Sequence, residues 1–110
     1  MERPVKGDIV VLPFPYTDLS EVKRRPALVA ATPRGENVVL VHITSRKRND
    51  EDAISLRTVD LLEGKLQFDS FAIPSVIFTA ENTTILYRAA RLKQEKIREV
   101  EEKLCELFTR

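Results

Sequence analysis

Apolar residues at the start of the chain form two short runs separated by a polar segment. The nearly continuous run Asp8–Pro13 predicts a strand that is buried on both faces. A second strand is predicted over Ala27–Ala31. Pro13 and Pro15 are expected to stop the pairing of the first strand or to confine it to an edge, because proline has no backbone N–H. The polar residues Thr17–Arg25 therefore predict a loop between the two strands.

The next segment alternates between apolar and polar residues. A turn is expected at residues 32–37, where proline and glycine occur close together, and a third strand over Val38–Thr44. Its alternation predicts one face formed by Val39, Val41 and Ile43, and the other by Leu40, His42 and Thr44. Residues 46–52 are all charged or amide-bearing, so they predict a solvated loop.

The middle of the chain has shorter apolar runs. They predict a short strand at Ala53–Leu56 and a turn or brief helix at Thr58–Leu62, before Gly64. Two further strands are expected at Phe68–Ile73 and Val76–Thr79, separated by proline. Residues 85–87 are apolar but too short for a firm assignment.

The last segment has helical periodicity. A helix is expected from about Lys93 to Phe108, with one apolar stripe formed by Ile97, Val100, Leu104, Leu107 and Phe108. Cys105 lies at the rim of this stripe and is expected to pack there. Glu99 and Lys103 have the spacing of a favourable ion pair along the helix.

These elements predict a mainly β protein with a C-terminal helix, built as a small SH3-like barrel or strongly curved antiparallel sheet. The 110 residues have room for a single domain over residues 1–110, and 43% apolar with 32% charged residues is typical of a globular protein. One cysteine, no leader peptide and no apolar run of bilayer length predict a soluble, cytoplasmic protein.

The net charge of +1 is distributed unevenly. Residues 1–48 carry nine basic and five acidic side chains, whereas residues 49–84 carry two basic and seven acidic ones. The basic residues cluster at positions 23–25 and 46–48, beside predicted strand ends. If those strands are neighbours, the two clusters form one phosphate-facing surface; otherwise they are two solvated loops.

Several kinds of chemistry are poorly supported. One histidine and no cysteine pair do not make a zinc site, and three consecutive acids at Asp50–Asp52 are usually solvated. The three glycines are too far apart for a phosphate-binding loop, and no serine has the sequence context of a nucleophile elbow. No metal or cofactor is therefore expected.

Arg25 is the most prominent candidate for binding an anion. Pro26 pushes Arg25 into an extended conformation at the mouth of a strand, which suits the binding of phosphate or carboxylate. A pairing of Arg25 with a loop acid such as Asp18 or Glu21 is equally consistent with the sequence.

Five stretches occur in an order that resembles a known family. They are Gly-Asp-Ile-Val at 7–10, Arg-Pro-Ala-Leu-Val at 25–29, Ile-Thr-Ser at 43–45, Asp-Ser-Phe at 69–71 and Ile-Phe-Thr at 77–79, before the terminal helix. This order resembles the MazF/PemK toxin ribonucleases of type II toxin–antitoxin pairs.

The resemblance implies a homodimer with a small barrel fold that cleaves single-stranded RNA without a metal, using the 2′-hydroxyl of the substrate. It implies that Arg25 and Thr44 are catalytic. RNA contacts are expected from Thr17, Lys23, Arg24, Ser45, Arg46, Lys47 and Arg48. An acidic, partly disordered antitoxin segment is the expected protein partner, on the same basic surface.

Two other functions are compatible with the sequence. One is a non-catalytic module that binds RNA or an antitoxin, and the other is a toxin that poisons a protein target such as DNA gyrase. The pair Arg25 and Thr44 favours the ribonuclease. His42 shares the face of Thr44 and has acid–base chemistry available, but an interface or packing role is the preferred interpretation.

Overall fold

The structure is a computed structural model that describes residues 3–15, 22–47 and 49–110. Its strands are β1 Asp8–Pro15, β2 Val22–Ala31, β3 Asn37–Thr44, β4 Ile54–Leu56, β5 Leu61–Gly64, β6 Ser70–Glu81 and β7 Tyr87–Leu92. Two single 3-10 turns, η1 Thr58–Asp60 and η2 Asn82–Thr84, precede β5 and β7, and the helix α1 covers Gln94–Phe108. No helix among the described residues is long and apolar enough to cross a membrane.

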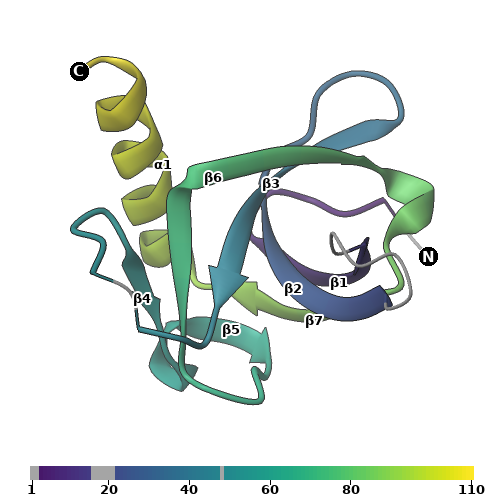
Figure 1. Ribbon diagram of the computed structural model, residues 1–110, viewed down its shortest axis with the longest axis horizontal. Coiled ribbons are helices and arrows are strands. Elements are labelled where there is room, and N and C mark those ends of the chain that lie inside the picture. The colour runs from purple at the N-terminus through teal and green to yellow at the C-terminus, as the bar shows by residue number, and fades with distance from the viewer. Residues whose placement is uncertain (1–2, 16–21, 48) are drawn as a thin grey trace.

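All seven strands belong to one antiparallel sheet with the order β4-β6-β3-β2-β1-β7-β5. The sheet curls into a nearly closed barrel, and α1 stands against one side of it (Figure 1). The predicted fold class is therefore confirmed. Strand β4 and strand β5 form the two ends of the sheet.

Both faces of the central strands are buried. Val41 and Ile43 of β3 belong to the apolar cluster that α1 covers through Ile97 and Val100. Leu40 and Val38 of the same strand belong to a second cluster on the opposite face. The alternation predicted for β3 is confirmed, and both of its faces are apolar because the curled sheet encloses one cluster while the helix covers the other.

The helix was predicted correctly, but its last turn differs from the prediction. Ile97 and Val100 are buried and Leu104 packs against the same cluster, whereas Phe108 is 72% exposed. Cys105 is also exposed, so its predicted packing role is wrong. The C-terminal end of α1 projects beyond the barrel (Figure 1).

The predicted pair of Glu99 with Lys103 is replaced by other ion pairs. Glu99 pairs with Lys96 at 2.9 Å, and Lys103 pairs with Glu106 at 3.3 Å, one position closer along the helix. Lys103 also lies 3.8 Å from Asp52 of the β3–β4 connection. This tertiary contact turns Lys103 away from Glu99.

The prolines of β1 do not stop its pairing with β2, contrary to one of the two predicted alternatives. The pairing of β1 with β7 does end at Val11, before the prolines, so this part of β1 has a strand partner on one side, as the predicted edge requires. Pro13 lies opposite Arg24 and Pro15 lies opposite Val22, so β2 begins five residues before Ala27, the expected start. Pro26 has no N–H, so its pair with Val11 is a non-hydrogen-bonded one. Because such pairs alternate with hydrogen-bonded pairs, the pairs made by Pro13 and Pro15 are of the same kind and lose no ladder bond.

The two strands predicted at Phe68–Ile73 and Val76–Thr79 form one continuous strand in the structure. Residues 70–81 form the single strand β6, and its register with β3 shifts between the pairs Val41–Ile77 and His42–Ile73. Pro74 lies in the extra residues between these pairs, where its missing donor is tolerated as a bulge. Strand β7 was not predicted, since its polar and charged residues hide the period of two.

The Gly-Asp-Ile-Val stretch has a structural role. The carboxylate of Asp8 is 2% exposed, accepts a hydrogen bond from the backbone N–H of Val5 at 2.9 Å, and accepts another from Nε of Arg91 at 2.8 Å. Hydrogen bonding and the charge of Asp8 raise the pKa of Arg91. Asp8 thereby fastens the start of the chain to β7.

Candidate active site

The pairing of β2 with β3 ends where two predicted site residues come together. Its last pair is Ala27 with His42, one residue before Pro26, which has no N–H to extend the ladder. Arg25 and Thr44 lie two residues beyond this last pair on β2 and β3, where Arg25 pairs with Leu12 of β1 and Thr44 pairs with Phe71 of β6. The two strands therefore open at the position of Arg25 and Thr44.

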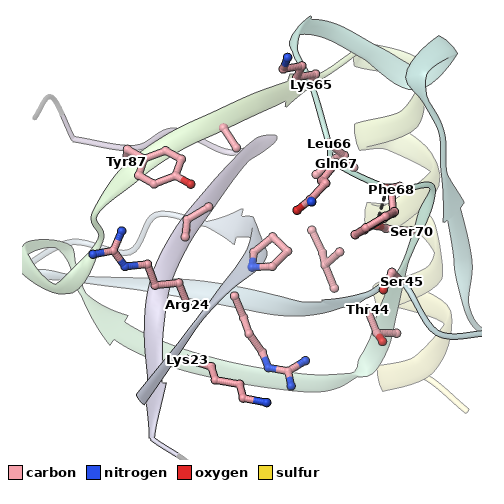
Figure 2. Close-up of a pocket in the computed structure, with 15 residues that line it drawn as sticks. Lys23, Arg24, Thr44, Ser45, Lys65, Leu66, Gln67, Phe68, Ser70 and Tyr87 are labelled. Carbon is pink, nitrogen blue, oxygen red and sulfur yellow. Dashed lines mark hydrogen bonds between the residues drawn. The ribbon is translucent and has the colours of Figure 1, made fainter. Parts of the chain in front are cut away.

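A pocket of about 760 Å³ lies at this opening (Figure 2). Five strands and two connecting segments contribute to it: Val11, Lys23, Arg24, Arg25, Pro26, Ile43, Thr44, Ser45, Lys65, Leu66, Gln67, Phe68, Ser70, Tyr87 and Ala89. Tyr87 lies opposite Val11, which in turn lies opposite Pro26. Since directly opposite residues share a face of the sheet, these three form an apolar surface beneath the charged groups.

The pocket is strongly basic. Lys23, Arg24 and Arg25 come from β2, and Lys65 comes from the β5–β6 connection. None of the described residues that line the pocket is acidic. Arg25 is half-buried, where its charge is screened less by water than the charges of the exposed Lys23 and Arg24. This arrangement attracts an anion and presents one partly desolvated guanidinium to it.

Thr44 is held in place by its own turn. The backbone N–H of Arg46 donates to Oγ1 of Thr44 at 3.1 Å, and the residue is only 7% exposed. Because the oxygen accepts this bond, the hydroxyl hydrogen is available for donation. The pocket thus combines a cation with an oriented neutral donor.

The sequence did not reveal the wall formed by Lys65, Gln67, Phe68 and Tyr87. Figure 2 shows Tyr87 on one side of the pocket and Phe68 on the other, with the amide of Gln67 directed between them. Phe68, followed by Asp69, Ser70 and then an apolar run, reads as the start of a strand. Its 61% exposure becomes visible only in the tertiary structure.

The predicted site residues have different outcomes. The structure brings Lys23, Arg24 and Ser45 together with Arg25 and Thr44 around one pocket. Arg46 and Lys47 are exposed on the following turn and do not line it. Thr17 and Arg48 lie outside the described residues, as do Asp18 and Glu21, the suggested partners of Arg25.

Arg24 and Arg25 are neighbours on β2, yet both line the pocket. The alternation places Arg24 on the face of Pro26 and Arg25 on the face of Ala27. Both reach the pocket because it opens at the end of the β2–β3 pair, where it is accessible from either face. Arg24 and Arg25 therefore differ in their position and burial, although both reach the pocket.

The described residues contain no group of three or more His, Cys, Asp or Glu side chains that could hold a metal ion. His42 is half-buried and does not line the pocket. The described residues of the pocket therefore offer the chemistry of arginine, lysine and hydroxyl groups.

The arrangement of strands and pocket residues leads to one family. The family model for the PemK-like, MazF-like toxins of type II toxin–antitoxin systems matches residues 5–108. The chain belongs to this family. No individual curated protein is a significant match to this MazF/PemK member by sequence.

Solved structures share the fold at low sequence identity. A MazE–MazF complex from Deinococcus radiodurans has a TM-score of 0.78 and 19% identity, over 98% of each chain. An endoribonuclease from a mycobacterial species, in complex with its cognate antitoxin, has a TM-score of 0.76 and 14% identity, over 96% of this chain and 95% of that one. The Mycobacterium tuberculosis toxin MazF-mt6 has a TM-score of 0.72 and 17% identity, over 93% and 96% of the two chains.

Proposed function

We propose that this MazF/PemK protein is an endoribonuclease toxin that cleaves single-stranded RNA without a metal ion. The observation that carries the proposal is that Arg25 and Thr44 line the same basic pocket, to which the described residues contribute no acidic side chain. An RNA phosphodiester suits this pocket because the RNA itself supplies the nucleophile, its 2′-hydroxyl. The pocket needs only to orient the 2′-hydroxyl and to stabilise charge.

In the proposed reaction the 2′-oxygen attacks the adjacent phosphorus while the bond from phosphorus to the 5′-oxygen breaks. The 2′-hydroxyl proton passes to water, and the 5′-oxygen leaves with a proton from water. The products are a 2′,3′-cyclic phosphate and a 5′-hydroxyl end. Arg25 neutralises the charge that develops on the phosphorane oxygens, and the hydroxyl of Thr44 donates to the same group.

Assembly and regulation complete the proposal. A symmetric homodimer is expected, because exposed apolar side chains such as Val76 and Leu86 lie outside the pocket. An acidic antitoxin segment that orders on binding would compete with RNA for Lys23, Arg24 and Arg25. The expected site of action is the cytoplasm, where RNA and an antitoxin would be present together. Light scattering that gives the mass of one chain would contradict the dimer.

The test of the activity is cleavage of an end-labelled single-stranded RNA in the presence of EDTA. Cleavage should persist, should leave 2′,3′-cyclic phosphate and 5′-hydroxyl ends, and should stop at positions where a 2′-deoxy nucleotide replaces the attacking residue. RNA binding without cleavage would instead support the alternative of a non-catalytic RNA-binding module. Cleavage that disappears on chelation and returns with magnesium would refute the metal-independent mechanism.

A further inference from the structure

Two of the residues that line the pocket are exposed aromatic side chains. Phe68 is 61% exposed and Tyr87 is 50% exposed, although each lines the pocket. An aromatic side chain that leaves so much surface in water gains little from the core of its own protein. Two of them at the mouth of a basic pocket form surfaces on which a planar ligand can stack.

The position of Phe68 is fixed by its neighbours. The Ser70 side chain is 6% exposed and its hydroxyl donates to the carbonyl oxygen of Phe68 at 2.9 Å. Ser70 lies opposite Leu56, and its neighbour Phe71 lies opposite Thr44. The turn that presents Phe68 is therefore tied to the strand pair that carries Thr44.

The side-chain amide of Gln67 lies between the two aromatic rings. Figure 2 shows the Gln67 amide directed into the pocket between Phe68 and Tyr87. An amide has a donor and an acceptor side by side, which matches the paired donor and acceptor on the edge of a nucleobase. A protein ligand would have less need of this combination of a stacking surface, a paired amide and four cations.

We infer that Gln67, Phe68 and Tyr87 form a nucleobase subsite beside the phosphate position at Arg25 and Thr44. Phe68 stacks on one base, Gln67 hydrogen-bonds to its edge, and Tyr87 closes the opposite side. Stacking tolerates any base, so Gln67 supplies the preference between bases. This inference rests on the proposed RNA substrate and deepens it.

The experiment measures binding of a short RNA whose 2′-hydroxyls are methylated, so that cleavage does not interfere. A set of such oligonucleotides carries one abasic site at each successive position, and fluorescence anisotropy gives each Kd. The proteins are the wild type, Phe68→Ala, Phe68→Trp and Gln67→Ala. Phe108→Ala is the matched control, because Phe108 is another largely exposed phenylalanine, on α1 and outside the pocket.

For the wild type and Phe108→Ala, one abasic position should weaken binding by about tenfold. Phe68→Ala should bind the intact RNA about tenfold more weakly and be insensitive to that abasic site, while Phe68→Trp should restore the sensitivity. Gln67→Ala should reduce the abasic penalty at the same position without removing it, because the hydrogen bond to the base edge is lost while the stacking on Phe68 remains. An abasic penalty that persists unchanged in Phe68→Ala would overturn the subsite.

Failure of the subsite and failure of the proposed function are distinguishable. RNA cleavage by the wild type without any abasic penalty would overturn the subsite alone. A penalty that Phe68→Ala removes, in a protein that cuts no RNA, would overturn the catalytic proposal and support the subsite.

Discussion

The hydroxyl oxygen of Thr44 accepts a hydrogen bond from the backbone N–H of Arg46 at 3.1 Å. The bond closes a short turn immediately after β3, so the side chain that borders the pocket is oriented by the backbone that follows it. Arg46 does not line the pocket, but its backbone N–H contacts a residue that does. Substitutions at Thr44 therefore test whether the hydroxyl group is needed.

Thr44→Ser keeps the hydroxyl and should retain cleavage within a few-fold of the wild type. Thr44→Val has nearly the same shape but cannot accept from Arg46 or donate to the phosphate. We expect it to lower the single-turnover rate by about ten- to a hundredfold, as is usual for the loss of a neutral hydrogen bond in the transition state. Thermal melts check that both variants fold. Equal rates for the two variants would remove Thr44 from the mechanism.

Arg25 and Arg24 differ in burial, and their substitutions should differ in kind. Arg25→Ala removes the half-buried guanidinium and should lower the single-turnover rate by about a hundred- to a thousandfold. Arg24→Ala removes an exposed charge, so it should weaken RNA binding and reduce the salt dependence by about one phosphate contact, with turnover nearly intact. Equal rate losses in both variants would leave only a basic binding surface.

Gly64 should be essential for the pocket wall that follows it. It has a φ of +77°, and a Cβ there would collide with the carbonyl oxygen of Ala89 and lie 2.6 Å from Cα of Ala90. Gly64→Ala should therefore lower the free energy of unfolding by about 3 kcal/mol and displace Lys65–Phe68. The measurements are denaturant unfolding and RNA affinity.

Gly35 provides the matched control for Gly64. Its φ of +102° is also positive, but a Cβ there would meet nothing within 4 Å. Gly35→Ala should cost only about 1–2 kcal/mol of backbone strain and leave RNA affinity unchanged. A Gly64→Ala protein as stable as Gly35→Ala would contradict the close approach of β5 to β7.

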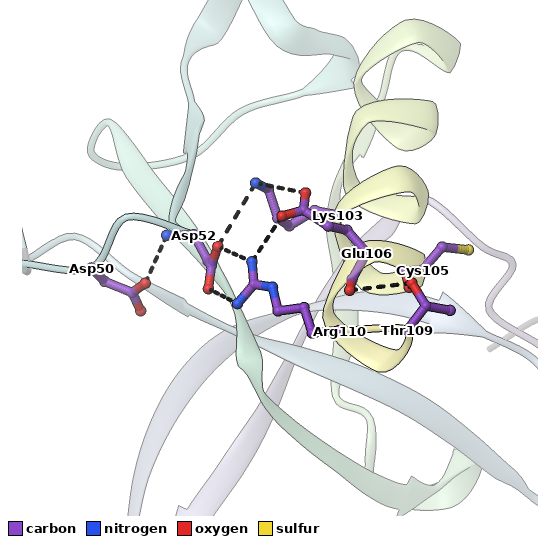
Figure 3. A network of polar contacts seen from close by, with 7 residues as sticks. All are labelled: Asp50, Asp52, Lys103, Cys105, Glu106, Thr109 and Arg110. Atoms are coloured by element: carbon purple, nitrogen blue, oxygen red, sulfur yellow. Dashed lines mark hydrogen bonds and ion pairs between the residues drawn. The ribbon is translucent and has the colours of Figure 1, made fainter.

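The ion-pair network at the end of α1 predicts that the stability of the protein depends on pH in the acid range. Arg110 donates to both carboxylate oxygens of Asp52, at 2.7 and 3.1 Å, and Lys103 lies nearby (Figure 3). The hydrogen bonds from Arg110 hold the pKa of Asp52 below its ordinary value of 3.8, although desolvation opposes them. The network joins the helix to the β3–β4 connection that begins after Thr44.

Because the pKa of Asp52 is lower in the folded state, the network stabilises the fold above pH 3.8, and this stabilisation is lost as the pH falls through the folded-state pKa. In Arg110→Gln, an NMR titration should show the Asp52 midpoint moving up toward 3.8. The stability difference between this variant and the wild type should disappear in strong acid. Arg98→Gln, on the exposed face of α1, is the control. An unchanged Asp52 midpoint in Arg110→Gln would contradict the network.

The local elements could be predicted from the sequence because their causes lie within a few residues. The period of two over Val38–Thr44 and the helical stripe at Ile97 and Val100 follow from which side chains must leave water. The extended backbone of Arg25 follows from Pro26 alone. Family resemblance, not periodicity, supplied the barrel topology and the role proposed for Thr44.

Strand continuity and the composition of the pocket were decided by contacts between distant residues. Pro13 and Pro15 belong to β1 because their register with β2 places them at non-hydrogen-bonded pairs, and a register is a relation between two strands. The same holds for Tyr87, which reaches the pocket through its pairing with Val11. Phe68 reaches it because β6 begins beside the end of β3. The sequence determined which side chains carry charge, rings and hydroxyls, whereas only the closure of the sheet decided which of them meet around one pocket.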